Sequence, residues 1–542
     1  METHMKMPEV VSNAATLIVS CVALTFSGLA ASHGDEAEKL GNVHFPISCN
    51  AEAQQGFHRA LAMLHSFWFP QTTKAFAEVA EVDPSCAMAQ WGIAIGQRAN
   101  PLVGAPAVEM MKRGWEAIEK AKTLNAKTQR ERDYIGALDL YYQDWDKPDH
   151  QTRVVAYEKA MEQVHLRYPE DLEAAVLYAL ALNEAITVLP VDKTYSRQLK
   201  AAGILGEVLR KKPDHPGALH YLIHSYDFPA LATRGLPTAN LYATVAPSAP
   251  HALHMPSHIY SMMGMWEESI QSNQAALGVA KSYVHAMDFM VYAYLQMAQD
   301  SQAERVMNES IVLQKAGGTA AQRTPTGGVL TVYTAHAAIP ARYVIERGAW
   351  AEAAALELHS RSPAADAITH FTRAMGSARL GDTANARKDI DKLQLLHDEL
   401  IQSKQDYWAE QLQIQRKAAS AWVAFAEGNR AEALALMRSA ADLEDGSDKH
   451  VAMENRLWPM RELLGELLLE LNEPALALKE FETSLGEARN RLRGIYGAAK
   501  SAQMAGDRRK AAMFYEEVLA LAKNADSDRH EIREAKAFLA TR

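Results

Sequence analysis

The chain has few cysteines, no excess of basic charge and no long apolar run beyond its N-terminal end. Only three cysteines occur in 542 residues, and none stands near the histidine-rich middle, which argues against a thiolate-ligated metal site. The formal net charge is −10 and no basic stripe is present, which argues against nucleic-acid binding. The Gly-x-Ser-x-Gly elbow, the HExxH and CxxC motifs and a Gly-rich phosphate loop are also missing. These absences remove the commonest catalytic signatures.

What is present is the composition of an ordered helical protein. Hydrophobic residues make up 48% and charged residues 23%, which is typical of a folded soluble chain. The numbers of glycines and prolines are modest. The long segments are rich in alanine, leucine, glutamate and glutamine, all of which are good helix formers. The length allows several domains or one long repeat array.

The N-terminal end is typical of an exported protein. Lys6 precedes an apolar run over residues 14–29, and small residues around Ala30 fit a signal-peptidase site. The sequence therefore predicts a signal peptide at 1–30 and a periplasmic or cell-surface location. Lipidation at Cys21 and an uncleaved single-span anchor are the alternatives, and only they would tie the protein to a membrane.

Two cysteines remain beyond the leader. Cys49 and Cys86 bracket the first predicted helical hairpin. An oxidising compartment favours their pairing, and two free buried thiols are the other interpretation.

A 34-residue helical repeat organises the chain. After a polar segment at 31–50, residues 51–84 form a helix, a break and a second helix closed by proline, which is the pattern of a tetratricopeptide repeat. Pro213 and Pro247 are 34 residues apart and each ends a second helix. Small residues, which let two helices cross closely, recur at the same interval at Ala201, Gly235, Ser269, Ala303 and again at Ala477 and Ala511.

The repeat predicts an all-α fold, a tetratricopeptide-type α-solenoid of stacked antiparallel helical hairpins. The stretch at 315–328 is the best linker candidate. We therefore divide the chain into an array at 51–316 and a C-terminal array at 317–542.

Histidines share places within this repeat. The segments HYLIHSYD (220–227), HALHMPSHIY (251–260) and HAMDFMVY (285–292) superimpose after shifts of 34 residues. The superimposed sets are His220 with His254 and Asp288, His224 with His258 and Tyr292, and His251 with His285. On helices, the spacings i, i+4 and i, i+3, i+7 place each group on one face. In such arrays these faces line the concave groove.

Imidazole is the commonest side-chain ligand of zinc, copper and iron, so the pattern predicts a transition-metal site with one of these metals. The core ligands are His220, His224, His254 and His258. Further ligands, or residues that orient the ligands, are His251, His285 and Asp288. Asp227 and Tyr292 are the expected hydrogen-bonding partners, and His65 and His336 are additional histidines that could reach the groove. The set suffices for one saturated site, an open catalytic site or a two-metal site.

Three other interpretations stay open. One is a metalloenzyme with a free coordination position. Another is a scaffold that binds a peptide or protein in its groove without metal, the usual work of this repeat. The third is a packing ladder of histidines copied with the repeat.

Several segments together resemble a family of exported bacterial tetratricopeptide repeat proteins of poorly described function. They are HFPISC (44–49), MLHSFWF (63–69), DPSCAMAQWGIA (83–94), IPARYVIERGAW (339–350) and the two histidine segments at 220–227 and 251–260. The resemblance covers most of residues 44–350 and implies a shared histidine site, without supplying a reaction. Members of that family tend to carry histidine where this chain has Asp288, a departure that bears on the metal or its reactivity.

Overall fold

The computed structural model describes residues 1, 38–317, 329–358, 362–450 and 456–541. The chain divides into two units, Met1–Glu38 and Lys39–Arg542, and every helix below belongs to the second unit. Residues 2–30 of the predicted leader and residues 318–328 of the predicted linker lie outside the described part. Of the helices described, none combines the length and apolar character that a membrane crossing needs.

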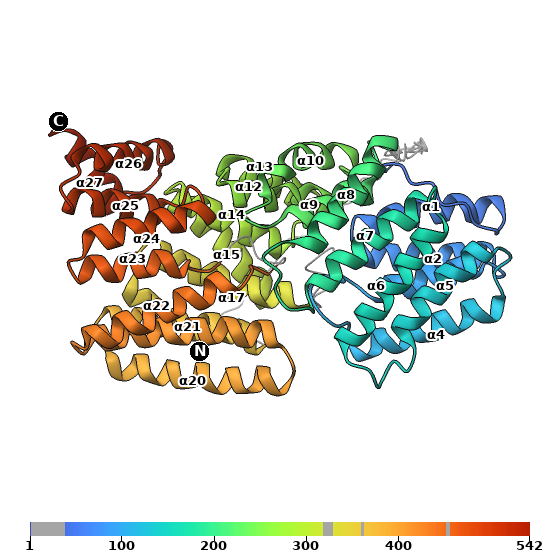
Figure 1. The fold of residues 1–542 in the computed structure, drawn as a ribbon, viewed down its shortest axis with the longest axis horizontal. Coiled ribbons are helices and arrows are strands. Elements are labelled where there is room, and N and C mark those ends of the chain that lie inside the picture. Colours follow the sequence, from blue (N-terminus) through green and yellow to red (C-terminus); the bar gives the residue numbers. More distant parts are fainter. Residues whose placement is uncertain (2–37, 318–328, 359–361, 451–455, 542) are drawn as a thin grey trace. The chain divides into compact units, whose positions relative to one another are not determined.

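Within the described residues the regular structure is α-helical, and successive helices pack against each other in chain order (Figure 1). The helices of the first array are α1 (Ala51–His65), α2 (Phe69–Val82), α3 (Ala87–Gln97), α4 (Val108–Leu124), α5 (Gln129–Tyr142), α6 (His150–Arg167), α7 (Leu172–Ile186), α8 (Ser196–Lys211), α9 (Pro216–Tyr226), α10 (Ala232–Val245), α11 (Pro250–His254), α12 (Pro256–Met263), α13 (Trp266–Val279), α14 (Val284–Gln296) and α15 (Asp300–Ala316).

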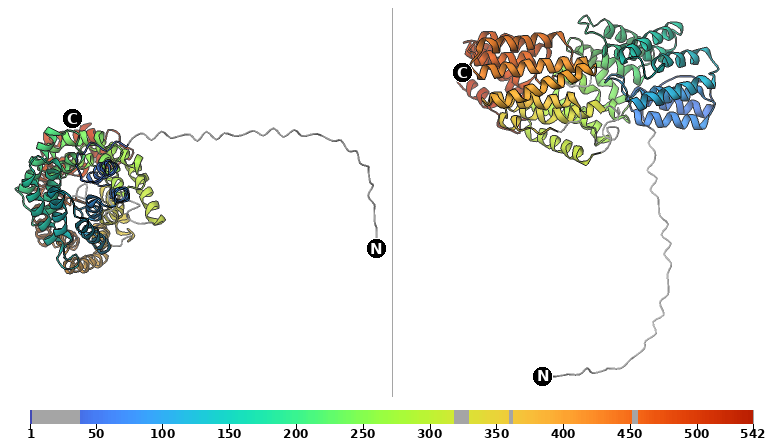
Figure 2. Two further views of the ribbon diagram at one scale, coloured as in Figure 1. Left: turned by 90° about the vertical axis from the view of Figure 1, so that its right-hand side faces the viewer. Right: turned by 90° about the horizontal axis from the view of Figure 1, so that it is seen from below.

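The second array continues the same stacking. Its helices are α17 (Val329–Glu346), α18 (Trp350–Ala354), α19 (Pro363–Arg379), α20 (Thr383–Gln402), α21 (Asp406–Ala426), α22 (Arg430–Gly446), α23 (Met460–Glu470), α24 (Pro474–Glu487), α25 (Leu492–Met504), α26 (Arg508–Leu521) and α27 (His530–Leu539). Within Lys39–Arg542 the first helices and the last ones lie at opposite ends of the stack (Figures 1 and 2). The all-α solenoid of tetratricopeptide type is confirmed.

Small residues stand where the helices cross, as the repeat spacing predicts. Ala201, Ser269 and Ala303 are fully buried on α8, α13 and α15. A Cβ added at Gly235 on α10 would lie 2.6 Å from the Ile259 side chain of α12. The Ile259 side chain therefore packs directly against the α10 backbone at Gly235, and a larger residue there would force it to move.

Glycines also set several of the turns within hairpins. At Gly381, Gly428 and Gly506 the φ angles are 79°, 85° and 84°, in the left-handed region where glycine costs least. The residue after each of them directly precedes helix α20, α22 or α26. The chain thus reverses direction in few residues, and the paired helices run antiparallel.

The second array contacts the first array through residues far away in sequence. Lys449 donates to the Asp227 carboxylate at 2.8 Å, and Lys193 donates to the Ser447 carbonyl at 2.7 Å. The indole of Trp266 on α13 donates to the Asn490 carbonyl at 2.8 Å. The two predicted arrays are therefore held together by polar contacts beside the site described below.

A disulfide joins Cys49 to Cys86, whose Cα atoms are 5.2 Å apart. The bond ties the start of α1 to the start of α3 and so encloses the first hairpin. Of the two interpretations of these cysteines, the structure contains the paired one.

Replacing both residues, Cys49→Ala/Cys86→Ala, is expected to lower the free energy of unfolding by about 2–4 kcal/mol, because a closed loop with a sequence separation of 37 restricts the unfolded chain. Urea unfolding followed by circular dichroism measures the loss. Wild-type protein treated with a reductant should lose a similar amount. Identical unfolding curves for the oxidised wild type and the variant would contradict this assignment.

Candidate metal centre

Four helices of the first array deliver six histidines to one place in the core. His220 and His224 lie on α9, and His285 lies on α14. Helices α11 and α12 carry the remaining three, His251, His254 and His258. Met255, between these two helices, has helical dihedral angles of −54° and −35°, so the chain continues as a helix past Pro256. Proline is tolerated there because it occupies the first turn of α12.

The first three histidines form a compact group, the first triad, made of His220, His224 and His251. The Nε2 atom of His220 lies 3.1 Å from Nε2 of His224 and 3.1 Å from Nε2 of His251. One nitrogen from each ring lies within 4.8 Å of the other two. Three ring nitrogens thus converge on one point from two helices.

The other three histidines, His254, His258 and His285, form the second triad. Nε2 of His254 lies 3.0 Å from Nε2 of His258. The His285 ring centroid lies 4.6 Å from that of His254, and the three candidate ligand atoms again lie within 4.8 Å of one another. Zinc holds imidazole nitrogens at about 2.0–2.1 Å, so an ion at the centre of either group fits these spacings.

The two triads are copies related by the repeat. Adding 34 to each residue number of the first triad gives the second. The grouping differs from the predicted helical faces. His251 groups with the two histidines of α9, whereas His254 and His258 group with the histidine of α14. A helix with ligands at i, i+3 and i+7 therefore serves two neighbouring centres.

Hydrogen bonds outside the triads turn the Nε2 atoms inward. His220 Nδ1 donates to the His65 carbonyl at 2.6 Å, and His254 Nδ1 donates to the Asn273 side-chain oxygen at 2.6 Å. His258 Nδ1 donates to the Asp227 carboxylate at 2.9 Å. A hydrogen on Nδ1 leaves the lone pair on Nε2, the nitrogen that faces the other rings. Such outer partners are what metal-binding histidines normally have.

The remaining two rings of the first triad are held differently. His251 Nδ1 lies 2.8 Å from the Tyr283 hydroxyl, which can accept its hydrogen in the same way. His224 Nδ1 has no hydrogen-bond partner among the described residues. His224 is instead fixed by packing against Phe67.

All six rings are buried, with exposed fractions of 0–5%, so they lie inside the stack and not along an open groove. Burial lowers the pKa of His220 to about 3 and that of His254 to about 4. Burial also lowers the pKa of the other four well below the ordinary value, and neighbouring histidines add to this shift. At neutral pH the rings are therefore uncharged, the form that binds metals.

Each triad has one phenylalanine against all three of its rings. Phe67 contacts the rings of the first triad at centroid distances of 4.4, 6.0 and 5.7 Å. Phe289 contacts those of the second triad at 4.8, 4.8 and 5.1 Å. These aromatic rings hold the imidazoles in place and keep water away from them.

One carboxylate and one ammonium stand beside the second triad. The same oxygen of Asp227 accepts from His258 Nδ1 and, at 2.8 Å, from Lys449 Nζ. Burial raises the pKa of Asp227 to about 6, and Lys449 opposes this rise. The prediction that Asp227 is a hydrogen-bonding partner agrees with this contact.

Three other predicted residues lie outside the triads. Asp288 faces Arg342, with 3.5 Å between Oδ1 and Nε, and Tyr292 accepts a hydrogen bond from Arg491 at 2.8 Å. Asp288 and Tyr292 occupy the places that His254 and His258 hold one repeat earlier. In this third copy the side chains contact arginines and do not converge with other histidines. His336 is buried on α17 and belongs to neither triad.

His65 belongs to a third buried group that the sequence did not reveal, together with Glu173 and His215. Nε2 of His65 lies 2.8 Å from one Glu173 oxygen, and Nε2 of His215 lies 3.1 Å from the other. His215 Nδ1 accepts from the Ala218 backbone N–H, so its hydrogen is on Nε2 and points at the carboxylate. This group is a carboxylate bridging two N–H donors, unlike the triads, in which ring nitrogens of neighbouring histidines face one another.

The third group nevertheless supports the first triad. It fixes His65, whose backbone carbonyl orients His220. Sequence inspection missed it because Glu173 looks like any acidic residue in the first turn of a helix, and His215 precedes α9 in a turn. Only the fold brings them within reach of His65, 108 and 150 positions away.

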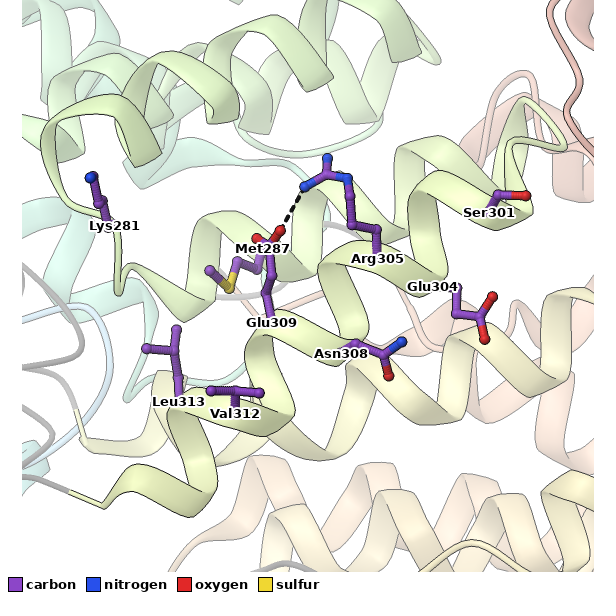
Figure 3. A pocket seen from close by; sticks show the side chains of 9 residues that line it. All are labelled: Lys281, Met287, Ser301, Glu304, Arg305, Asn308, Glu309, Val312 and Leu313. Carbon is purple, nitrogen blue, oxygen red and sulfur yellow. Dashed lines mark hydrogen bonds and ion pairs between the residues drawn. The ribbon is translucent and has the colours of Figure 1, made fainter.

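Two cavities lie apart from the triads. One of about 690 Å³ runs along α15, where Arg305 and Glu309 pair at 2.7 Å beside Val312 (Figure 3). Another of about 600 Å³ reaches Glu173 and His215 of the third group. None of the six triad histidines lines either cavity.

No protein-family model and no curated protein matches the chain. Among solved structures, a tetratricopeptide repeat protein from Parabacteroides merdae is 14% identical, with 64% of this chain and 99% of the other covered and a TM-score of 0.25. The Cut9–Hcn1 hetero-tetramer of the APC/C is 12% identical, with 90% and 89% covered and a TM-score of 0.33.

A human IFIT1 dimer with PPP-AAAA is likewise 12% identical, with 85% and 89% covered and a TM-score of 0.37. Scores this low carry no argument about the histidines. The chemistry of the site therefore rests on its own geometry.

Gly217→Ala is expected to destabilise the protein by about 1–3 kcal/mol, because a Cβ at this position would lie 2.4 Å from His65 Nδ1. Thermal unfolding is the measurement. Gly203→Ala on α8 is the matched control, since nothing lies within 4 Å of its added Cβ, and we expect it to be neutral or slightly stabilising. Equal melting temperatures for the two variants would rule out the close contact at His65.

Proposed function

We propose that this protein binds two transition-metal ions, one in each triad. The observation that carries the proposal is the exact 34-residue copy of a three-histidine group, in which pairs of Nε2 atoms face each other at 3.0–3.1 Å. Packing alone gives no reason for ring nitrogens to face one another at this distance in both copies, because at most one of any facing pair can donate a hydrogen. A cation at each centre resolves this repulsion.

Copper is the metal that the site suits best. The ligands are neutral imidazoles, and neither triad contains a carboxylate or thiolate. Non-haem iron sites usually include carboxylates, and two zinc ions would bring four positive charges into a buried region. Two Cu(I) ions bring only two, with Asp227 and Lys449 cancelling each other nearby. Copper also stands highest in the usual affinity order of divalent ions for nitrogen ligands.

Three ligands leave one coordination position free at each centre. A metal bound by three histidines can take a small molecule in that position, which is the arrangement of catalytic and not of purely structural sites. We therefore place the protein among candidate metalloenzymes or small-molecule-binding metalloproteins. The predicted leader supports export, and the disulfide is consistent with an oxidising compartment.

Protein binding is the second candidate function, because tetratricopeptide arrays are common interaction scaffolds. The cavity along α15 favours it, since its lining includes the apolar side chains of Met287, Val312 and Leu313. Peptide capture by this surface would be insensitive to chelators, in contrast to any function of the triads.

Purified protein loaded with Cu(I) under anaerobic conditions is expected to retain two copper ions per chain. The variants His220→Ala/His224→Ala and His254→Ala/His258→Ala should each retain about one, because each removes two of the three ligands of a single triad. Elemental analysis after desalting measures the content, and circular dichroism confirms folding.

The matched control is His397→Ala/His530→Ala, which removes two histidines outside all three buried groups and should keep both ions. A folded wild type without bound metal, even after titration with copper and zinc, would refute the proposal. A wild type that holds a single ion, with no ion left in either triad variant, would show one shared site instead.

Asn273→Ala is expected to weaken the ion of the second triad by roughly 10- to 100-fold, the usual effect of removing the outer partner of a metal-binding histidine. The first triad should keep its affinity for the metal. Titration with a competing chelator should therefore remove the two ions in two separate steps. Gln274→Ala changes the neighbouring residue of α13, whose side chain contacts the Tyr294 hydroxyl instead, and should leave both steps unaltered. An equal loss at both sites would contradict separate triads.

A further inference from the structure

The cavity of about 600 Å³ that reaches the third buried group lies apart from both triads, and we call it the strap cavity. Its walls come from the segment 42–48 before α1, from the starts of α5 and α7, and from the turn before α9. The Glu170 side chain in its lining is 90% exposed, so the cavity opens to solvent. Small-molecule sites usually have volumes of roughly 300–1,000 Å³. The strap cavity is therefore large enough for one small organic ligand.

Two buried carboxylates line this cavity. Glu131 in the first turn of α5 and Glu173 in the first turn of α7 are each 1% exposed. Glu131 accepts hydrogen bonds from the Ser48 backbone N–H at 2.6 Å and from the Thr128 hydroxyl at 2.9 Å. Glu173 accepts those of the two histidines of the third group. Burial alone would raise the pKa of each carboxyl, but the interactions with these donors outweigh it and lower both pKa values. Both groups are therefore ionised at neutral pH.

Neither of these carboxylates has a basic side chain beside it. Among the described residues, no lysine or arginine forms an ion pair with Glu131 or Glu173. Two basic residues line the strap cavity, but both face other carboxylates. Arg130 pairs with Asp171 at 2.5 Å, and Lys212 lies 3.5 Å from an oxygen of Asp214.

The histidines beside Glu173 do not supply the missing positive charge. His215 Nδ1 accepts the Ala218 backbone N–H, so this nitrogen carries no hydrogen and the ring is neutral. Burial lowers the pKa of His65, which is therefore also neutral at pH 7. The N-terminal ends of α5 and α7 stabilise the two carboxylates, but with partial charges only. Two negative charges thus stay uncompensated in the cavity wall, whereas buried charges are normally paired.

We propose that the strap cavity binds a small aliphatic amine in its ammonium form. An ammonium group has three N–H donors, and the oxygens of Glu131 and Glu173 have lone pairs beyond those already used. The apolar side chains of Pro46, Ile47 and Leu172 line the same cavity and suit a short aliphatic body. This inference goes beyond the proposed function, because it requires no metal in either triad.

The same features disfavour other ligands. A bare metal ion would fill only a small part of the volume, and the Nε2 atom of His215 carries a hydrogen and so offers it no lone pair. An anion would be repelled by the two uncompensated carboxylates. A quaternary ammonium group has no N–H donor, and the lining contains no phenylalanine, tyrosine or tryptophan among the described residues to form an aromatic cage for it.

The probe is cadaverine, a five-carbon diamine, titrated into the full chain by isothermal titration calorimetry. We expect one molecule to bind per chain, and glutarate, the dicarboxylate of the same carbon number, not to bind. Glu131→Gln and Glu173→Gln should each weaken the affinity for cadaverine by roughly 10- to 100-fold, because an amide replaces the charged acceptor of the ammonium.

A further variant keeps both carboxylates, since each of them also holds neighbouring residues in place. Ile47→Trp adds bulk to the lining of the cavity and should abolish cadaverine binding. The matched control is Glu119→Gln, which removes an exposed carboxylate of α4 that pairs with Lys122 outside the cavity and should leave binding unchanged. Circular dichroism checks the folding of every variant.

The outcomes against the proposal are specific. A wild type that ignores millimolar cadaverine, or that binds glutarate equally well, would overturn it. Binding that survives Ile47→Trp and both glutamine variants would place the amine elsewhere. An amine held by a metal of the second triad would be lost in His254→Ala/His258→Ala, whereas an amine in the strap cavity is retained there. None of these results changes the metal content, so the proposed function is tested separately.

Discussion

The site depends on the hydrogen bonds that hold the outer nitrogens of the imidazoles. The carbonyl of His65, the amide of Asn273 and the carboxylate of Asp227 each take the hydrogen of one Nδ1 atom. Without these acceptors a buried imidazole could place its hydrogen on either nitrogen, and the inward lone pairs would be lost. The rest of the fold supplies these acceptors: His65 ends α1, Asn273 lies on α13, and Asp227 follows α9. The solenoid brings them together because each hairpin stacks on the one before it.

The repeat spacing was sufficient to predict the helical stack and all six histidines that converge in it. It could not predict how they divide. His251, His254 and His258 share a helical face, yet α9 lies on one side of that helix and α14 on the other, so the set is split between two centres. Periodicity along one helix carries no information on which neighbour each side chain meets.

Other parts of the site depend on contacts between distant residues, which a single sequence does not reveal. Tyr292 repeats His258 in the pattern, but its hydroxyl contacts Arg491, 199 positions away. That arginine is buried against Glu346 and Glu462, both at 2.9 Å. In the third copy of the pattern Asp288 and Tyr292 stand in place of histidines, and buried arginines contact them there. The ligand series therefore ends after two copies.

The contact of Lys449 with Asp227 joins positions that are 222 residues apart. It means that the surroundings of the second triad are completed by a part of the chain synthesised long after the histidines themselves. A nascent chain that ends before Lys449 holds the six rings without this ammonium beside them, and its Asp227 carboxylate lacks that cation. The mature electrostatic environment of the centre therefore exists only once the C-terminal array has folded back on the first. Assembly of the site in its final form therefore has to wait for the segment that carries Lys449.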